Sequence, residues 1–376
     1  MSSKKMRALQ TITCYIFLVI FVSFANLARA QDVSGCEASA SHGCYDKEKS
    51  LKLKIIAIFT ILVASVIGIG LPLFSTAFPA LHPDRTPALV VKTLASGVIL
   101  STGFMHVLPD SWANLTSECL PENPWRMYPM STLIAMFTTI LTMMMDTIAT
   151  AYYKKRGMKN RLHSHGGGGH GHGHGHGGGV NVIHHIENDS GNETELVDQN
   201  NDKIVQGGTV DDKESQLLRY RIVAQVLELG IVVHSVVIGL SMGVSNNPCT
   251  IRPLVAAMCF HQLFEGMGLG GCILQADYGI KMKAIMVAFF ATTTPLGIAI
   301  GLAILNVYDE NSPAALIIVG VLNAMSSGLL IYMALVDLLA ADFMGPKLQA
   351  SIKLQFVCYA AVFLGMGVMS LMAKWA

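Results

Sequence analysis

Eight long apolar runs dominate this 376-residue chain and constrain its fold more than any other feature. A helix needs about 20 mainly apolar residues to cross the hydrocarbon core of a bilayer, and each run approaches that length. The runs are continuous rather than alternating, so they predict membrane-spanning helices and not the strands of a barrel. They cover residues 55–74, 90–108, 129–152, 222–244, 253–274, 284–305, 314–339 and 354–372.

Charged residues are too scarce for a soluble protein of this size. They make up 14% of the chain, whereas soluble domains carry about 25%. The net charge of +1 provides no overall attraction to nucleic acid. We therefore expect an all-α integral membrane protein built as a bundle of eight transmembrane helices.

The N-terminus is typical of a secretory signal peptide. A basic start precedes an apolar run at 11–24, and an A-x-A pattern ends at Ala30. An uncleaved first helix is the alternative, but the run is short for a full span. We expect a signal peptide at 1–30 and an extracytoplasmic segment at 31–52.

Basic residues assign the loops to the two sides of the membrane. Basic residues follow the third span, precede the fourth, and lie in the loops between spans five and six and between spans seven and eight. These loops should therefore be cytoplasmic, which puts both termini of the mature chain outside. Four lysines before the first span break this rule, which a cleaved signal peptide would explain. The plan is helices 1–3 in 53–152, a cytoplasmic loop at 153–218 and helices 4–8 in 219–376.

The long loop is low in complexity and rich in histidine and glycine. Such a segment buries too little apolar surface to fold alone, so we expect it to be disordered. His-Gly repeats are typical of flexible metal-chelating tracts, and a simple linker is the alternative. Its histidines are His163, His165, His170, His172, His174, His176, His184 and His185.

Four of the eight cysteines lie on the predicted outer side of the membrane. Cys36 and Cys44 flank a short extracytoplasmic segment, and Cys119 and Cys249 fall in loops. A disulfide within either pair would suit that compartment. The sequence leaves the pairing open.

Two histidines lie deep in apolar spans, where an ionisable residue is costly and therefore points to function. His261 and Glu265 are four residues apart, so they share one face of the fifth helix. At about 1.5 Å per residue, His234 lies roughly 20 Å from the inner end of its span, and the other two lie roughly 12–20 Å from the outer end of theirs. All three therefore meet near the middle of a core about 30 Å thick.

Imidazole and carboxylate ligands suit zinc, iron(II) and manganese(II). Ser235 and Gln262 can add neutral oxygens or orient the ligands from behind. The lack of a thiolate partner argues against copper(I). An interhelical hydrogen bond is the alternative for each residue taken alone, but three residues at one depth favour a metal site.

Five other polar residues suggest a route for a cation. His106 and Asp110, near the outer end of the second span, could collect cations at the mouth or form an interfacial helix cap. Asp146, Glu228 and Asp337 could pass a cation inward, and structural pairing is the competing account for each.

The fourth and fifth spans resemble the signature of the ZIP family, the zinc- and iron-regulated transporter-like proteins. The similar residues are His234, Ser235, Gly239, His261, Gln262, Glu265 and Gly266. Segments 106–110 and 228–234 look most like the plant branch. The eight spans, the outside termini and the histidine-rich loop match too, so the resemblance covers about residues 50–376.

The resemblance implies a carrier that moves zinc or iron(II), or manganese or cadmium, into the cytosol by alternating access, with helices two, four, five and seven around the metal. Asp337 matches an acidic seventh-helix residue of some members. Ile238 stands where some members carry a glutamate that bridges two metals, so we expect one main transport site. No prosthetic group is expected, since Zn²⁺ or Fe²⁺ is the substrate.

Three other classes were compared with this interpretation. A cation-efflux carrier would show fewer spans and an HxxxD pair. An intramembrane metalloprotease would need a sequence such as H-E-x-x-H, which the chain lacks, so no enzyme is expected. A membrane metal sensor would use the same ligands and stays an alternative. We expect a multi-pass protein of the plasma membrane, with an internal membrane as the alternative. Its expected partners are the metal ion and the lipid bilayer, and no nucleic acid is expected. A homodimer is possible on this interpretation.

Overall fold

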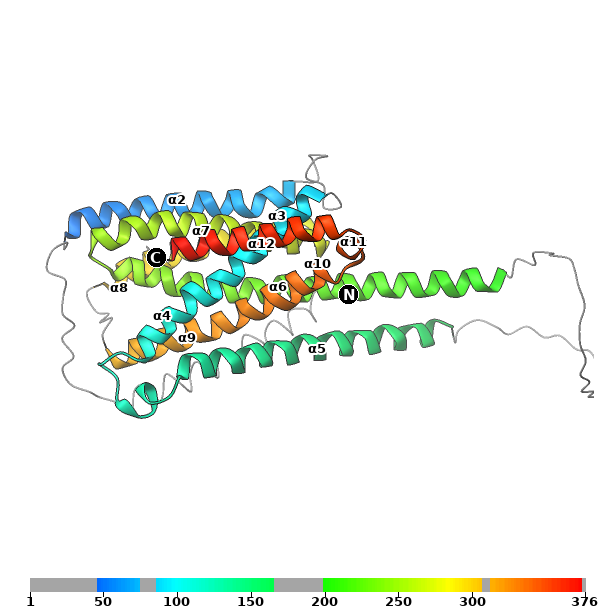
Figure 1. Cartoon of the computed structure of the whole chain (residues 1–376), viewed down its shortest axis with the longest axis horizontal. Helices are drawn as coiled ribbons and strands as arrows, with labels where there is room; N and C mark the ends of the chain where they lie inside the picture. Colours follow the sequence, from blue (N-terminus) through cyan, green and yellow to red (C-terminus); the bar gives the residue numbers. More distant parts are fainter. Residues whose placement is uncertain (1–45, 75–85, 166–198, 306–311, 374–376) are drawn as a thin grey trace, which may run out of the picture.

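A computed structural model of the chain describes residues 46–74, 86–165, 199–305 and 312–373 (Figure 1). Throughout these ranges the regular elements are helices. Seven helices in the described ranges are long and apolar enough to cross a membrane, which agrees with the expected all-α membrane fold. They cover Lys47–Phe74, Thr86–Leu115, Met130–Ile148, Arg219–Val244, Ile280–Ile304, Pro313–Phe343 and Ile352–Met372.

Two of the long helical rods are each built from three consecutive elements. α3, η3 and α4 form one rod and α9, η5 and α10 another, and η3 and η5 are π-helical segments. The bounds are α2 (Lys47–Phe74), α3 (Thr86–Ser101), η3 (Thr102–Val107), α4 (Leu108–Leu115), η4 (Glu122–Arg126), α5 (Met130–His165), α6 (Gln199–Val244), α7 (Pro248–Gln275), α8 (Ile280–Ile304), α9 (Pro313–Tyr332), η5 (Met333–Ala340), α10 (Ala341–Phe343), α11 (Pro346–Gln349) and α12 (Ile352–Met372).

α7 has 28 residues but is not among the seven apolar helices. It carries Arg252 near its start and three buried polar residues, His261, Gln262 and Glu265, in its middle. These side chains lower its mean hydropathy. The residues that mark this helix as functional therefore also weaken its membrane signature.

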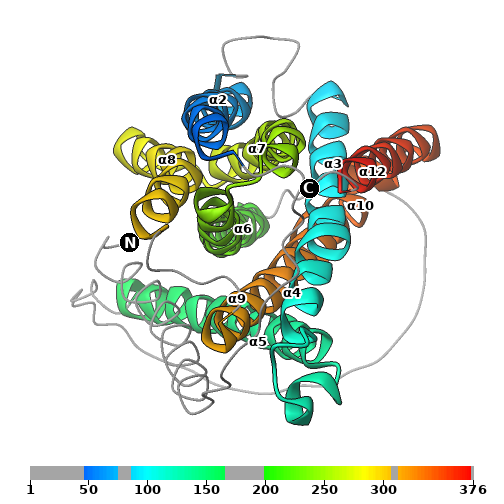
Figure 2. The ribbon, with the colours of Figure 1, turned by 90° about the vertical axis from the view of Figure 1, so that its left-hand side faces the viewer.

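Seen end-on, the long helices form two groups (Figure 2). The first contains α2, α6, α7 and α8, which pack in the pairs α2–α7, α6–α8 and α2–α8. The second contains α3, α5, α9 and α12, where α3 packs on α12 and α5 on α9. α6 and α7 also contact α9 and α3, so these four helices form the boundary between the groups.

Glycines bring helix backbones into direct contact inside the first group. Gly239 and Gly243 of α6 face Gly297 and Gly301 of α8. A Cβ added to Gly243 would lie 2.6 Å from the carbonyl oxygen of Ile298 and 2.7 Å from the Cα of Gly301. Small residues spaced four apart on both helices are what such close packing in a membrane requires.

Glycines at the boundary between the groups meet side chains instead of backbone. Gly230 of α6 faces Leu329 of α9, and Gly268 of α7 faces Ile99 of α3. Side chains can change rotamer, whereas backbone contacts are rigid. The two groups are therefore joined less firmly to each other than α6 is joined to α8.

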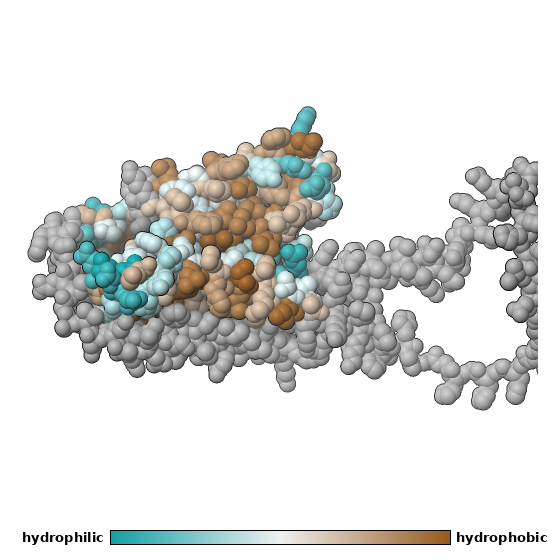
Figure 3. All heavy atoms as spheres, turned by 60° about the horizontal axis from the view of Figure 1, so that its bottom comes forward, coloured by the Kyte–Doolittle hydropathy of each residue, from teal (hydrophilic) through white to brown (hydrophobic). Residues whose placement is uncertain are grey.

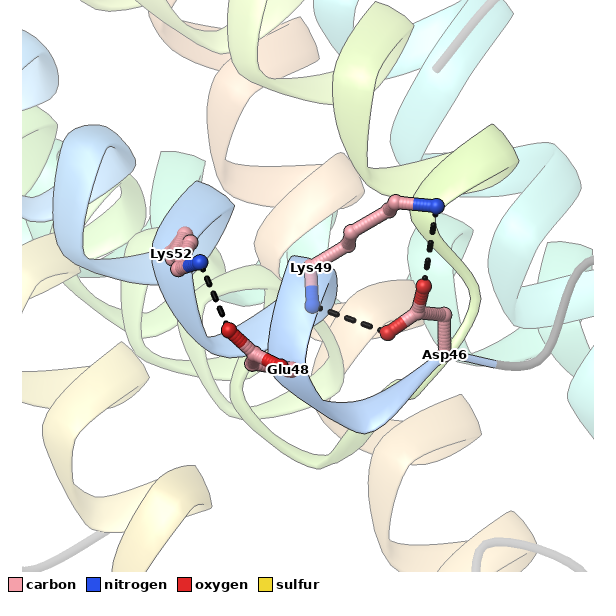
Figure 4. Close-up of polar contacts among 4 residues, drawn as sticks. All are labelled: Asp46, Glu48, Lys49 and Lys52. Atoms are coloured by element: carbon pink, nitrogen blue, oxygen red, sulfur yellow. Dashed lines mark hydrogen bonds and ion pairs between the residues drawn. The ribbon is translucent and has the colours of Figure 1, made fainter.

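At the N-terminal end of α2, three of the four lysines that break the positive-inside pattern have polar partners. Asp46 accepts a hydrogen bond of 3.0 Å from the backbone N–H of Lys49 and pairs with its ammonium at 3.1 Å, and Lys52 pairs with Glu48 at 2.7 Å (Figure 4). The backbone hydrogen bond from Lys49 is the main reason that the pKa of Asp46 is lowered. Lys54 is buried and donates to the carbonyl oxygen of Gly243, at the C-terminal end of α6, at 2.7 Å.

The structure differs from the expected disordered loop at 153–218 at both ends. α5 continues to His165 and α6 begins at Gln199, so the expectation of disorder is corrected for these two stretches. Lysine, arginine, methionine and glutamine favour the helical backbone, so a helix can continue past its apolar part. The centre of the loop, 166–198, lies outside the described residues.

Cysteines in the outer connections are disulfide-bonded, as the predicted compartment allows. Cys119 and Cys249 each form a disulfide, whereas Cys259, Cys272 and Cys358 are free thiols. Cys36 and Cys44, along with the expected signal peptide, lie outside the described residues.

Large apolar side chains cover the outside of the bundle. Phe59 of α2, Phe137 of α5 and Phe363 of α12 are each more than 60% exposed, at 64%, 64% and 66%. On the face drawn in Figure 3 apolar residues occupy the middle and hydrophilic residues lie toward the ends. An apolar band with polar ends is suited to a lipid bilayer.

Candidate metal centre

Three imidazole rings meet in the middle of the bundle, at the boundary between the two helix groups. The ring centroids of His234 in α6 and His261 in α7 are 5.4 Å apart. The ring of His106 in η3 lies 5.5 Å from His234 and 6.1 Å from His261. All three side chains are buried, with at most 4% of their surface exposed.

Glu265 completes the cluster from the next turn of α7. Its Oε2 lies 3.2 Å from Nε2 of His261, although the two atoms do not have the geometry of a hydrogen bond. Glu265 is fully buried. The predicted convergence of His234, His261 and Glu265 thus agrees with the structure.

His106 lies deeper than the sequence analysis placed it. The predicted second span ended at 108, whereas the rod continues through α4 to Leu115. The π-helical turn of η3 also widens the helix at this point, as π-bulges often do at functional sites. His106 is therefore a member of the central cluster and not a residue of the mouth.

Two serines of α9 form hydrogen bonds with the backbones of α6 and η3 beside the cluster. The hydroxyl of Ser326 donates to the carbonyl oxygen of Gly230 in α6 at 2.9 Å, and that of Ser327 donates to Gly103 in η3 at 3.0 Å. Both serines are fully buried. These bonds set the depth at which η3 and α6 present their histidines.

Buried polar atoms without hydrogen-bond partners are concentrated here. Native proteins leave few such atoms unsatisfied, because each costs about 1–3 kcal/mol. Here they gather around the three imidazoles. They are Nε2 of His106, both ring nitrogens of His234, Oγ of Ser235, Nε2 of His261, the amide atoms of Gln262, both carboxylate oxygens of Glu265 and Oδ1 of Asn323.

The distances are close to those of ligands on one ion. Zinc bonds of about 2.0–2.2 Å put two tetrahedral ligand atoms about 3.3 Å apart and two imidazole centroids about 5 Å apart. Nε2 of His261 and Oε2 of Glu265, at 3.2 Å, have this spacing. Among the described residues no three His, Cys, Asp or Glu side chains have fully converged on one point. His106 and His234 would therefore turn their rings to complete the ligand set.

A cavity of about 310 Å³ reaches the cluster from the predicted outer side. His106 and His234 line it with Asp110, Asn114 and Asn323. Six water molecules occupy about 180 Å³ at the density of liquid water, so a hydrated divalent ion fits. Asp110 lines the cavity one turn along the rod from His106, on the predicted outer side.

Apolar side chains close the bundle on the inner side of the cluster. Leu227 and Ile231 of α6 pack with Leu330 of α9 in one cluster, and each is fully buried. They lie one or two turns inward of His234 and Asn323. Among the described residues, the cavity that reaches the centre lies on its predicted outer side.

Two of the three acids on the predicted inner side each have a polar partner. The hydroxyl of Tyr332 donates to Asp146 at 3.2 Å, and Asp337 in η5 lies 3.5 Å from the guanidinium of Arg219. Oδ1 of Asp146, both oxygens of Asp337 and Oε1 of Glu228 are buried without a hydrogen-bond partner. The pairs formed by Asp146 and Asp337 are consistent with a structural role. The unpartnered carboxylate oxygens are consistent with a role in binding a cation.

Two of the eight loop histidines fall within the described residues. His163 and His165 lie in the last turn of α5. The other six loop histidines lie outside the described residues.

Sequence reasoning missed two polar residues at the centre. Asn323 lines the cavity from α9, and the hydroxyl of Thr102 lies 3.2 Å from Nδ1 of His261. Asparagine and threonine commonly join membrane helices by hydrogen bonds, so neither stands out in one sequence. Thr102 and His106 are four residues apart within the predicted second span, so a helical wheel of that span would have placed them on one face.

Comparisons with known proteins show which proteins the chain resembles over its full length. A family model described as ZIP zinc transporter matches residues 51–373. Zinc transporter 7 of Arabidopsis thaliana is 52% identical over 100% of this chain and 99% of its own length. Fe(2+) transport protein 1 of Oryza sativa subsp. japonica is 53% identical over 93% of this chain and 92% of its own. Fe(2+) transport protein 1 of Arabidopsis thaliana is 53% identical over 96% and 97%.

Proposed function

Because this chain belongs to the ZIP zinc transporter family, we propose that it carries zinc and iron(II) into the cytosol through the centre formed by His106, His234, His261 and Glu265. Its membership confirms the family predicted from the sequence and makes it a multi-pass membrane metal transporter rather than an enzyme. The similar proteins are named for zinc and for Fe(2+), which is why we propose both ions.

One observation carries the choice of site. Ten or so buried nitrogen and oxygen atoms without partners surround three imidazoles and a carboxylate in the middle of an apolar bundle. A divalent cation supplies the partner that the carboxylate, hydroxyl and amide oxygens and the unprotonated imidazole nitrogens among them lack. Imidazole nitrogen with a single carboxylate suits both zinc and iron(II).

The proposal takes α7 as an eighth membrane-crossing helix. Its 28 residues extend about 42 Å at 1.5 Å per residue, which exceeds a hydrocarbon core of about 30 Å. Its polar residues face the interior of the bundle and not the lipid, since His261, Gln262 and Glu265 are at most 1% exposed. Buried polar groups of this kind are where membrane transporters place their substrate sites.

Alternating access follows from the position of the centre between the two helix groups. His106 belongs to the group of α3, whereas His234, His261 and Glu265 belong to that of α6 and α7. The cavity opens outward, and Leu227, Ile231 and Leu330 close the inner side. A shift of one group against the other would open the inner side and also separate His106 from the remaining ligands. Without His106 as a ligand, the centre would bind the ion more weakly in the conformation that is open on the inner side, which favours release of the ion.

One main transport site is proposed. Ile238 lines the cavity one turn outward from His234 and packs with Met242 and Met258 in an apolar cluster. An isoleucine offers no ligand for a second, bridged ion. Ser235 and Gln262 contribute neutral atoms beside the main site.

The inner acids form the exit of the proposed route. Asp337 is paired with Arg219, whose side chain is 42% exposed, while that of Asp337 is fully buried. A cation that arrives from the centre would compete with this guanidinium for the carboxylate. Asp146 and Glu228 supply further unpartnered oxygens on the inner side, and the loop histidines would chelate the ion there.

We place the transporter in the plasma membrane because the N-terminus is typical of a secretory signal peptide. Surface labelling of intact cells that express the full chain tests this location. Homodimer formation stays a prediction, which the mass of the detergent-solubilised protein would decide.

Competition uptake in metal-deficient yeast tests the function. Cells that express the chain should accumulate zinc or iron(II), and excess unlabelled zinc, iron(II), manganese(II) or cadmium should reduce this uptake in the order of their affinity. Net loss of metal from the cells would indicate efflux instead, and metal binding without any flux would indicate a sensor.

A further inference from the structure

Thr102 makes two contacts that together indicate which ring nitrogen of a neutral His261 carries the proton. Its Oγ1 is 3.0 Å from the carbonyl oxygen of Val98, one turn earlier, and 3.2 Å from Nδ1 of His261. A threonine hydroxyl has one proton to donate, and a carbonyl oxygen can only accept. Both contacts are hydrogen bonds only if the hydroxyl donates to Val98 and accepts from an Nδ1–H of His261.

A proton on Nδ1 leaves the lone pair of the neutral ring on Nε2. Nε2 is the atom that faces Oε2 of Glu265 at 3.2 Å, and it has no hydrogen-bond partner among the described residues. Two acceptors at this distance repel each other, and a cation bound to both removes the repulsion. The tautomer that Thr102 selects is therefore the one in which His261 and Glu265 can bind the same ion.

The other imidazole of the first helix group is not held in this way. Both ring nitrogens of His234 are buried without a partner. Of these two histidines, His261 is thus the one whose orientation and proton are fixed before the ion arrives. Partners of this kind typically change metal affinity by about 10–100-fold when they are removed.

We propose that Thr102 is a positioning residue of the metal centre, which keeps Nδ1 of His261 protonated so that Nε2 is presented to a divalent transition-metal ion together with Glu265. The inference rests on the proposed function, because it takes His261 as a ligand. Thr102 lies on η3, in the other helix group, so the bond also ties the two groups together at the depth of the site.

The test compares three variants of the full chain in metal-deficient yeast, with uptake of labelled zinc corrected for surface abundance. Thr102→Val keeps the shape of the side chain but cannot accept the hydrogen bond, and Thr102→Ser can. Thr142→Val is the matched control, because Thr142 is also buried and donates to the carbonyl one turn earlier, that of Thr138, at 2.7 Å. It contacts none of the imidazoles of the centre.

We expect Thr102→Val to raise the KM for zinc by about tenfold or more, with the maximal rate largely kept, whereas Thr102→Ser and Thr142→Val stay within about twofold of the native chain. An unchanged KM in Thr102→Val, or a serine variant as impaired as the valine variant, would overturn the proposal. If Thr102→Val fails to reach the surface, Thr102→Ala replaces it and must show the same rise. Loss of surface expression in both, with Thr142→Val normal, would show that the role of Thr102 is only structural.

His261→Ala separates the two levels of the argument. If this variant transports normally, the proposed centre fails. If it is inactive while Thr102→Val has a native KM, the centre stands and only the positioning role fails.

Discussion

The imidazole rings of His234 and His261 stand at 81° to each other with their centroids 5.4 Å apart, although they lie on different helices that run in opposite directions. α6 ends at Val244 and α7 begins at Pro248, so the two helices form a hairpin across the bundle. Both histidines lie roughly half way along the apolar part of this hairpin. The short connection fixes their common depth, and the α6–α8 and α2–α7 packing holds the hairpin in the first helix group.

The first prediction concerns the two ligands of α7. His261→Ala and Glu265→Ala should each reduce metal uptake at least about 100-fold, since losing a ligand of a buried ion costs roughly 3 kcal/mol or more. Surface abundance should stay near that of the native chain. The measurement is uptake of labelled zinc or iron(II) per transporter at the surface.

Glu48→Gln provides the control for these variants. Glu48 is a glutamate on the outer surface, where its pair with Lys52 is exposed and contributes little to stability. Its uptake should be native. Native uptake in both His261→Ala and Glu265→Ala would instead disprove the assignment of the site.

The candidate ligands of the α6–α7 hairpin could be found from the sequence because their recognition depends on local spacing. His261 and Glu265 are one turn apart, and histidine in an apolar run is rare enough to be noticed. The depth of His106 could not be predicted in the same way. It depends on where the second rod ends and on the π-helical turn of η3, and neither follows from hydropathy.

Thr102 and Asn323 show why neutral residues of the centre escape a sequence-based search. Their side chains are common in membrane helices, and their roles depend on which atom of another helix they meet. Thr102 matters because its hydroxyl meets a ring nitrogen of α7, and Asn323 because its oxygen faces a cavity. Contacts between residues so far apart in sequence depend on how the helices pack.

A second prediction concerns Asn323. Its buried Oδ1 has no partner and lines the cavity with His106 and His234, so it can accept from water on a hydrated ion or bind the ion itself. Asn323→Leu keeps the volume but removes this oxygen, and should raise the KM for metal by several-fold. Asn323→Asp adds a charge beside the site and should lower the KM while slowing the maximal rate, because the ion is released less readily.

Uptake kinetics of both Asn323 variants, with Val319→Ala as the control, check this prediction. Val319 lines the same cavity without a polar atom, so its variant should have a native KM. Equal kinetics for Asn323→Leu and the native chain would exclude Asn323 from the path of the ion.

The third prediction concerns the packing of α6 on α8. A Cβ on Gly243 would lie 2.6 Å and 2.7 Å from backbone atoms of α8, which cannot move out of the way as a side chain can. Gly243→Ala should therefore destabilise the bundle by about 1–3 kcal/mol. Gly271→Ala is the control, because no atom lies within 4 Å of its added Cβ. The melting temperatures of the detergent-solubilised variants decide the matter: a native value for Gly243→Ala would mean that the two helices are not in contact there.

The last prediction separates the histidine-rich loop from the transport path. α5 and α6 continue beyond the apolar bundle before the loop begins, at His165 and Gln199, so the loop joins the helices at a distance from the centre (Figure 1). Deleting residues 163–176 should leave the maximal uptake rate largely intact, because His234, His261 and Glu265 stay in place. It should change the external zinc concentration at which uptake is curtailed, since a His-Gly tract binds zinc reversibly. Uptake measured over a range of zinc concentrations tests both parts, with a control chain in which the same histidines are replaced by asparagine at constant loop length. Complete loss of uptake in a deleted chain that still reaches the surface would place the loop on the path of the ion.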